Sequence, residues 1–499
     1  MSQKINADAD FCGRVPLHQT NLIQPHGVLL VVDITSHHIL QASENAETVF
    51  GVSVKELVAV KLTDVLSGTD RENLTSLLAA GNTGKLPFSF QLRQKNYLSY
   101  IHQKQEFYIL EIDISRRDKA DESFASVYQN IKYIVAAMEA TTTTGETCRV
   151  IAKELKKLSG FDKVMIYQFD EAWNGDVIAE EKEEGMESYL GLKFPASDIP
   201  KQARELYKKT PYRLIPSVDY QPVKLYPVLN PNTNAFTDLS DSNLRSVAGV
   251  HLEYLRNMNV TASMSTRILK DGELWGLIAC HHRTANYLSF EMCAVFELMS
   301  DMITAKIGAM QNADLLAYKT ARRQGLNEIM QLIYRNDGPG SYIQTLFTLL
   351  EADGMSIVLD NHIASAGKTP SGTEVEDLVL WLSSNEVKDV YHQPSLPSVY
   401  EPAENYAPVV SGLLALPIEH SKGNFILAFR SEAVQKVSWG GNPAEAIRFE
   451  SDGKKYHPRA SFQQWQQTVR NQAVPWKKEV LQTAEEVRII LTSYRLNNR

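Results

Sequence analysis

The sequence predicts an α+β protein built from three mixed segments of strands and helices, each followed by a long helical stretch. Its 499 residues correspond to three domains at roughly 150 residues per domain. Strand-like runs fall into three groups along the chain, and between the groups apolar residues recur at spacings of three and four. An apolar content of 43% with 22% charged residues is typical of folded domains.

The overall charge and apolar pattern exclude several classes of function. The chain carries 51 Lys and Arg against 59 Asp and Glu, and a net charge of −8 disfavours a nucleic-acid-binding surface. No apolar run reaches the roughly 18 residues that a membrane helix needs. The stretch 1–11 lacks the apolar core of a secretory signal. We therefore expect a soluble, cytoplasmic protein that binds neither nucleic acid nor membranes.

The four cysteines are scattered and show no spacing typical of a disulfide framework or a zinc site. Cys280-His281-His282 looks like a ligand cluster, but it ends a predicted strand. Since successive side chains of a strand point to opposite faces, His281 and His282 cannot share a site. We expect no metal there.

The first segment begins with two strands, 27–33 and 38–41, around a turn. A partly alternating run at 107–114 closes the sheet, and a helix is expected over about 123–140.

The second segment begins with a helix near Glu146 and a strand over 163–169. Two strand-like runs, 263–269 and 274–280, flank Asp271-Gly272, which is a strong hairpin signal. The polar region 220–246 reads as a loop, and a loop of this length in a compact domain is usually functional.

The third segment follows a nearly continuous helix from Ser289 to about Tyr334. Strands are expected at 355–360, 362–365 and 424–430, whereas the insertion from about 431 to 471 fits no regular element. The last helix begins after Pro475. Its apolar residues step by four and three, which fits either a short coiled coil or packing on its own domain.

Two stretches could carry chemistry. Residues 194–200 precede the helix-forming run 201–209, and they allow two interpretations. In one, Ser197 or Asp198 caps the helix; in the other, Asp198 presents its carboxylate or its carbonyl to a donor in a pocket. In a helical reading of 250–258, His251 shares one face with Tyr254, and it is either a core residue or a ligand contact.

Three further side chains remain open to two interpretations. Arg213 and Arg245 are either solvated surface charges or planar forks that grip a carboxylate. Cys12 lies near a polar terminus, where a thiol is usually incidental.

Taken together, these residues form five motifs in a fixed order. They are Cys12 with His18-Gln19 and Ile23-Gln24-Pro25-His26-Gly27; Pro195 to Pro200 with Tyr207 and Arg213; Leu244-Arg245-Ser246-Val247 with His251 to Met258; Trp439-Gly440-Gly441-Asn442-Pro443; and Pro458-Arg459-Ala460-Ser461-Phe462. Over nearly its whole length the sequence therefore resembles the photosensory core of the bacterial phytochromes.

The resemblance implies three domains with antiparallel sheets joined by long helices. These are a PAS domain at 1–120 with the chromophore-attaching segment, a bilin-binding GAF domain at 121–310, and a PHY domain at 311–499. The PHY domain would carry a tongue at about 431–471 and a C-terminal output helix. The family also has a figure-of-eight knot, in which Ile23 would thread the loop 220–246.

The resemblance also selects the pigment. Plant and cyanobacterial relatives attach a linear tetrapyrrole through a cysteine directly before the histidine of the His251 motif, where this chain has Val250. Cys12 matches the attachment point of the members that bind biliverdin. The implied cofactor is biliverdin IXα, joined as a thioether when the Cys12 thiolate adds to its vinyl group.

The family pattern assigns roles to the remaining pocket residues. Arg213 and Arg245 would clamp the propionates with help from Ser263 and Ser265, and the Asp198 carbonyl and His251 would support the pyrrole N–H groups. The residues placed around the pigment are Tyr167, Phe194, Ile199, Pro200, Tyr207, Tyr254 and, near ring D, His281.

Light would rotate ring D, and the tongue would respond. Arg459 would pair with Asp198 in one state and Ser461 would replace it in the other, with Pro458 and Trp439 in the same switch. Helices near 290–320 and 476–499 would form a homodimer and pass the change to an output domain or response regulator.

Many relatives end in a histidine kinase or a nucleotide cyclase, but the sequence shows no phosphoacceptor helix, ATP lid or cyclase motif, so we expect no catalytic output in this chain. Ala248-Gly249-Val250 replaces a more usual Ser-Pro pattern. Asn259 replaces a usual glycine at a turn that asparagine can still form. An alternative function is a light-independent GAF protein that binds a bilin or a small ligand, which would leave the Trp439 and Pro458 motifs unexplained.

Overall fold

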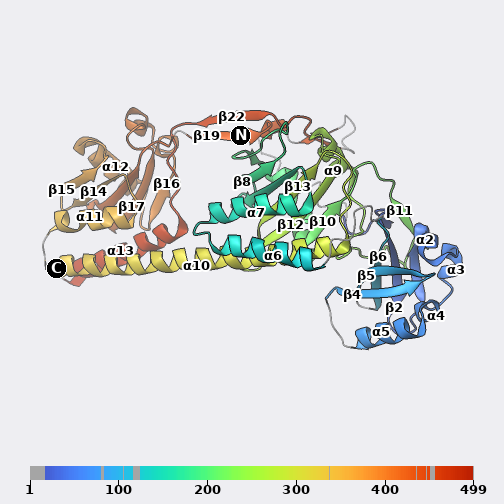
Figure 1. Cartoon of the computed structure of the whole chain (residues 1–499). Helices are drawn as coiled ribbons and strands as arrows, with labels where there is room; N and C mark the ends of the chain where they lie inside the picture. The colour runs from blue at the N-terminus through green and yellow to red at the C-terminus, as the bar shows by residue number, and fades with distance from the viewer. Residues whose placement is uncertain are drawn as a thin grey trace. The chain divides into compact units, whose positions relative to one another are not determined.

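The computed structural model describes residues 17–79, 84–104, 106–115, 124–335, 338–433, 435–445, 447–449 and 456–497. Contacts divide the chain into two compact units, 1–310 with 438–465 and 311–437 with 466–499 (Figure 1). No helix among the described residues is both long enough and apolar enough to cross a bilayer. Cys12 lies outside the described residues.

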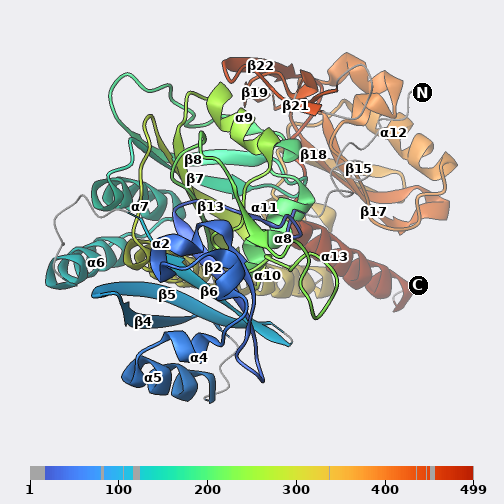
Figure 2. The same ribbon diagram turned by 90° about the vertical axis from the view of Figure 1, so that its right-hand side faces the viewer.

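The first unit contains a seven-stranded antiparallel sheet covered on one face by short helices (Figure 2). In spatial order its strands are β1 (Leu22–Ile23), β11 (Val223–Tyr226), β3 (Ile39–Ser43), β2 (Gly27–Asp33), β6 (Phe107–Asp113), β5 (Lys95–Lys104) and β4 (Leu86–Leu92). The helices are α2 (Glu47–Phe50), α3 (Val54–Leu57), α4 (Leu62–Val65) and α5 (Gly68–Ala79).

The polar region 220–246 is not entirely loop, because it contributes β11 to this sheet. β11 pairs with β3 on one side and with β1 on the other, so among the described strands β1 joins the sheet through this distant region. Ile23 also forms an isolated bridge with Arg245.

The same unit contains most of an eight-stranded sheet that carries the second segment, and β19 and β22 of this sheet extend past residues 438 and 465. Its strands, in spatial order, are β10 (Tyr212–Ile215), β12 (Ala262–Lys270), β13 (Glu273–His282), β7 (Lys163–Phe169), β8 (Gly175–Lys182), β9 (Lys193–Phe194), β19 (Gln435–Gly440) and β22 (Gln464–Val469). The hairpin predicted at Asp271-Gly272 is confirmed, and both residues have positive φ, at +51° and +80°.

Because side chains alternate along each strand, the two faces of this sheet pack against different elements. One face packs on α6 (Phe124–Glu139), α7 (Thr144–Ser159) and the first part of α10 (Phe290–Tyr334), and it forms a large apolar core. The other face meets α8 (Lys201–Lys209) and α9 (Gly249–Asn257) and is lined by aromatic side chains. The predicted helix from Ser289 to Tyr334 is confirmed as α10.

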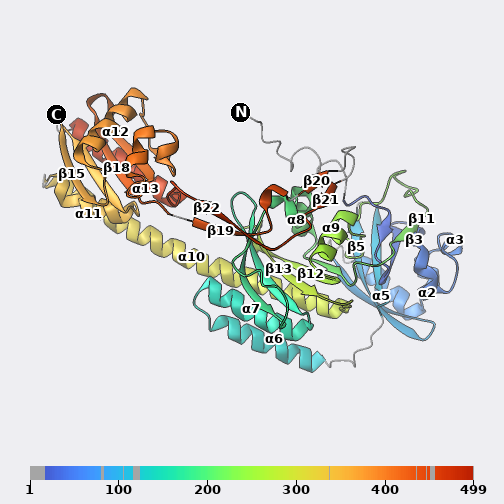
Figure 3. The same cartoon turned by 90° about the horizontal axis from the view of Figure 1, so that it is seen from above.

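The insertion at 431–471 contains regular elements, so the prediction that it fits none is wrong. It contains β19, β20 (Ile447–Phe449), β21 (Tyr456–Pro458) and β22. β20 and β21 form a separate ribbon whose second strand lies beside α9 (Figure 3). β20 pairs with β21 within the insertion, and β19 lies between β22 and the distant strand β9, where Trp439 pairs with Lys193.

The second unit contains a five-stranded antiparallel sheet with helices on both faces. The strand order is β15 (His362–Gly367), β14 (Gly354–Leu359), β18 (Asn424–Arg430), β17 (Gly412–Glu419) and β16 (Tyr391–Gln393). The second part of α10, α11 (Pro339–Leu349) and α13 (Lys478–Asn497) cover one face, and α12 (Gly372–Ser384) covers the other. The α13 seam, which is the row of apolar residues that step by four and three, has four members buried in this core: Val480, Ala484, Val487 and Leu491. The seam therefore packs on its own domain.

Candidate functional site

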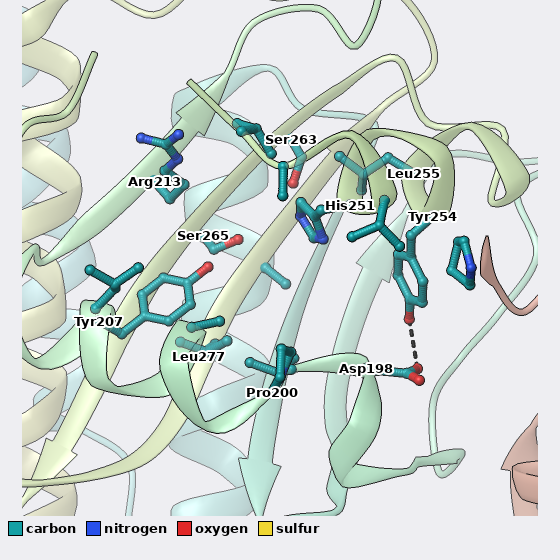
Figure 4. A pocket seen from close by; sticks show the side chains of 18 of the residues that line it. Asp198, Pro200, Tyr207, Arg213, His251, Tyr254, Leu255, Ser263, Ser265 and Leu277 are labelled. Carbon is teal, nitrogen blue, oxygen red and sulfur yellow. Dashed lines mark hydrogen bonds between the residues drawn. The ribbon is translucent and has the colours of Figure 1, made fainter. Parts of the chain in front are cut away.

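A cavity of about 560 Å³ lies on the aromatic face of the eight-stranded sheet. The thirteen residues that the sequence predicts around the chromophore line it, from α8, α9, strands β7, β9, β10, β12 and β13, the segment 195–200 and the loop with Arg245. Figure 4 shows part of this lining. They are Tyr167, Phe194, Asp198, Ile199, Pro200, Tyr207, Arg213, Arg245, His251, Tyr254, Ser263, Ser265 and His281. The volume is in the usual range of small-molecule and cofactor sites.

Strand periodicity explains the floor of the cavity. Ser263 and Ser265 on β12 alternate with buried residues, and the register pairs them with His281 and Ala279 on β13. Because cross-strand partners lie on the same face, these side chains meet in one row.

Helix α9 supplies the wall that carries His251. His251 and Tyr254 are stacked with ring centroids 6.0 Å apart, and Met258 follows on the same face. Asn259 ends the helix with φ of +55°, which confirms that asparagine forms the left-handed turn here. Desolvation, with a smaller effect of the Arg213 charge, lowers the pKa of His251 to about 4, so its ring is neutral at pH 7.

Asp198 does not cap α8, which corrects one of the two interpretations of its motif. Pro200 occupies the N-cap position, and α8 has no side-chain cap. The Asp198 carboxylate instead accepts a hydrogen bond of 2.8 Å from the Tyr254 hydroxyl (Figure 4). Both of its oxygens also lie 2.5 Å from Nη2 of Arg459.

The Arg459–Asp198 pair is almost completely buried, with side chains 2% and 4% exposed. Arg459 also donates to the carbonyl of Gly440, and its own carbonyl accepts from Asn257 on α9 at 3.0 Å. Burial raises the pKa of Asp198, and the guanidinium of Arg459 opposes that rise. This pair joins the insertion to the wall of the cavity.

Two guanidinium groups lie at another side of the cavity. Arg213 donates to the carbonyls of Asn243, at 3.2 Å, and Arg245, while Arg245 donates to the Leu17 carbonyl at 2.9 Å. Burial, with repulsion from Arg213, lowers the pKa of Arg245 to about 9. Neither arginine has an ion pair with a carboxylate within the described part of the chain, so this side of the cavity favours an anionic group.

The two histidines that end β13 point to opposite faces, as predicted. His281 lines the cavity, whereas Nδ1 of His282 lies 3.2 Å from Asp162. Burial lowers the pKa of His281 to about 3, and its buried Nδ1 atom has no hydrogen-bond partner in the described structure. The described ranges contain no cluster of three or more metal-ligating side chains.

The remaining predicted residues divide into two groups. Pro458 lines the cavity, and Trp439 lies in β19 paired with Lys193, whereas Ser461 is exposed and does not line the cavity. Sequence reasoning missed a contact between His457 of β21 and Glu253 of α9, with His457 Nδ1 2.9 Å from Oε1. No local signal could have found it, because the two residues are 204 positions apart.

Family models match three successive parts of the chain. A PAS fold matches residues 12–115, a GAF domain matches 143–307, and a phytochrome region matches 335–499.

Known phytochromes are similar over nearly the whole chain. Cyanobacterial phytochrome B of Nostoc sp. is 37% identical over 96% of this chain, which spans 65% of that protein's length. A bacteriophytochrome of Pseudomonas aeruginosa is 32% identical, with 98% of this chain and 67% of the relative covered.

Solved structures show the same fold. A crystal structure of a bacteriophytochrome from R. palustris has a TM-score of 0.82 at 31% identity, covering 97% of this chain and 99% of that one. The photosensory core module of the Stigmatella aurantiaca phytochrome has a TM-score of 0.79 at 33% identity, covering 97% and 98%.

Proposed function

This chain belongs to the phytochrome family and comprises its PAS-GAF-PHY photosensory core, and from this premise we propose that it is a red/far-red photoreceptor module that binds biliverdin through Cys12. The observation that carries the proposal is the cavity itself. It combines aromatic lining residues, two arginines without a carboxylate partner among the described residues, and the buried Asp198.

The residues present fit a bilin, which is long, flat and apolar and carries two propionates. Arg213 and Arg245 would each hold a propionate, because a guanidinium fork matches a carboxylate. The neutral His281 ring has an unpartnered Nδ1 for a polar group at another part of the cavity. A bound bilin supplies light absorption and rotation of its ring D.

The other residues would hold and enclose the pigment. Asp198 would offer its main-chain carbonyl, and His251 its ring, to the pyrrole N–H groups, and Ser263 and Ser265 would assist at the propionates. The aromatic and apolar residues Tyr167, Phe194, Ile199, Pro200, Tyr207 and Tyr254 would exclude water from it.

The attachment through Cys12 is supported by elimination among the thiols. Cys148, Cys280 and Cys293 are buried and do not line the cavity, and Val250 stands directly before His251. Of the four cysteines in the sequence, Cys12 is the one that remains. Its thiol would add across the vinyl double bond, with the sulfur bonding to one carbon and a proton going to the other.

The buried pair would then act as the switch. In the state described here Arg459 holds Asp198. We propose that this pair breaks when ring D rotates, and that Ser461 replaces Arg459 as the tongue at about 431–471 changes its secondary structure. Pro458 and Trp439 would move with it.

Output and assembly also belong to the proposal. The chain spans about two thirds of the length of its first relatives, so a downstream module, such as a histidine kinase, would receive the signal through α10 and α13. A homodimer would use helical faces near 290–320 and 476–499 other than the buried α13 seam. We retain domains at 1–120, 121–310 and 311–499, and a knot in which Ile23 threads the loop 220–246.

The test is to add biliverdin or phycocyanobilin to the purified chain and record red/far-red difference spectra and zinc-induced fluorescence on a denaturing gel. We expect a covalent biliverdin adduct and reversible spectra. Cys12→Ser should abolish the fluorescence, whereas the control Cys148→Ala should keep it. Fluorescence that persists in Cys12→Ser refutes the attachment, and preferred use of phycocyanobilin refutes the pigment. Binding without any change under light would support the alternative, a light-independent bilin-binding GAF protein.

A further inference from the structure

A buried carboxylate on the first sheet reaches the segment that carries the two cavity arginines. Glu111 lies on β6 and is 0% exposed. Its Oε2 atom accepts hydrogen bonds from the Ser242 hydroxyl at 2.9 Å and from the Leu244 amide at 2.8 Å. Glu111 therefore fixes both the side chain and the backbone of a segment more than 130 positions away.

The segment 242–246 is the scaffold of the arginine pair. Arg213 has no acidic partner among the described side chains and is held by the carbonyls of Asn243 and Arg245. Arg245 itself belongs to the segment. A displacement of the segment would therefore move both guanidinium groups together.

A second contact explains why a carboxylate suits this position. Lys85 Nζ lies 3.5 Å from Oε1 of Glu111 and donates to the Asn243 side chain at 2.8 Å. Without Glu111, Lys85 would lose this counter-charge while it still holds the Asn243 side chain of the segment. An unpaired ammonium beside the segment would favour its rearrangement.

We propose that Glu111 is a positioning residue that holds Arg213 and Arg245 in place for the two acidic arms of the ligand. This inference rests on the proposed bilin function. Glu111 does not line the cavity, so it acts through the segment 242–246 and not by contact with the ligand.

The test compares biliverdin with its dimethyl ester, which has the same ring system but no propionate charge. Binding is titrated by absorbance in a Cys12→Ser background, so that the equilibrium is reversible. The variants are Glu111→Ala, Glu111→Gln and, as a matched control, Glu154→Gln, which changes a nearly buried carboxylate on α7 that pairs with Lys157.

We expect Glu111→Ala to weaken binding of the diacid roughly tenfold or more and to change binding of the ester less than twofold. Glu111→Gln should show a smaller loss for the diacid, because its amide oxygen can still accept from Leu244. Glu154→Gln should leave both affinities unchanged. If Glu111→Ala does not fold, the Glu111→Gln comparison decides.

Equal losses for both ligands, or no loss for either, would overturn the positioning role. The failure of the proposed function would look different. A parent protein that binds neither ligand refutes the bilin function, and one that binds diacid and ester equally well refutes the arginine clamp.

Discussion

Removal of the Arg459 side chain is the sharpest perturbation of this molecule. The Asp198 side chain is 4% exposed beside Arg459, and in Arg459→Ala its carboxylate would keep the Tyr254 hydroxyl as its one hydrogen-bonding side chain among the described residues. Breaking a buried ion pair by deleting one partner costs about 3–5 kcal/mol, since the remaining charge stays desolvated. The insertion also loses its direct bond to Asp198, so we expect it to open locally by a comparable amount.

The assay is hydrogen exchange followed by mass spectrometry on peptides covering 438–445 and 456–465. A cost of about 3 kcal/mol corresponds to exchange that is on the order of a hundredfold faster. The matched control is Arg256→Ala, which removes an arginine 3.1 Å from Asp219 with side chains 47% and 72% exposed. Such a pair contributes about 0–1 kcal/mol, so exchange should change by less than about fivefold.

A double substitution separates the unpaired charge from lost packing. Asp198→Asn combined with Arg459→Ala removes both charges, so exchange should be slower than in Arg459→Ala alone. The reasoning would be refuted if Arg459→Ala and Arg256→Ala had equal effects. It would also be refuted if the double variant exchanged faster than the single one.

Two further predictions concern stability. A Cβ atom on Gly440 would lie 2.6 Å from the Phe194 ring, so Gly440→Ala should destabilise the first unit by about 1–3 kcal/mol in urea unfolding. The control Gly145→Ala places its Cβ with nothing within 4 Å and should not destabilise it. Equal unfolding midpoints for the two variants would contradict this prediction. Burial lowers the pKa values of His251 and His281 to about 4 and 3, below the value of 6.5 in an unfolded chain, so the unfolded state takes up protons first and stability is lost as pH falls below 6.5. Between pH 7.5 and pH 5.5, each histidine should lower the free energy of unfolding by about 1.4 kcal/mol. His281→Gln should therefore reduce the slope of the free energy of unfolding against pH, and an identical slope would show that His281 does not contribute.

Local patterns in the sequence predicted much of the fold. The strand 163–169, the hairpin around Asp271-Gly272 and the helix from about 289 to 334 agree with β7, β12–β13 and α10 to within two residues. Such elements are specified by short-range periodicity and turn chemistry, which neighbouring residues carry on their own.

The motifs also suggested thirteen chromophore-binding residues, and all of them line one cavity. The family resemblance predicted the contact between Asp198 and Arg459, which joins positions 261 apart, but no local pattern in the sequence links the two residues. The role of Glu111 has no sequence signal at all, since an acidic residue within a buried strand shows only that it needs partners and not which ones.

What the sequence alone determined is the family, the order of the domains and the elements with their own periodicity. Only the tertiary structure decided that the insertion after β18 forms strands, that β11 joins the first sheet, and that the α13 seam packs on its own domain. β11 pairs with strands of the N-terminal segment, β19 of the insertion also pairs with β9, and α13 packs on β17, so each element has a partner far away along the chain. A strand at the edge of a sheet gains its stability from that partner, so its own sequence needs no distinctive pattern.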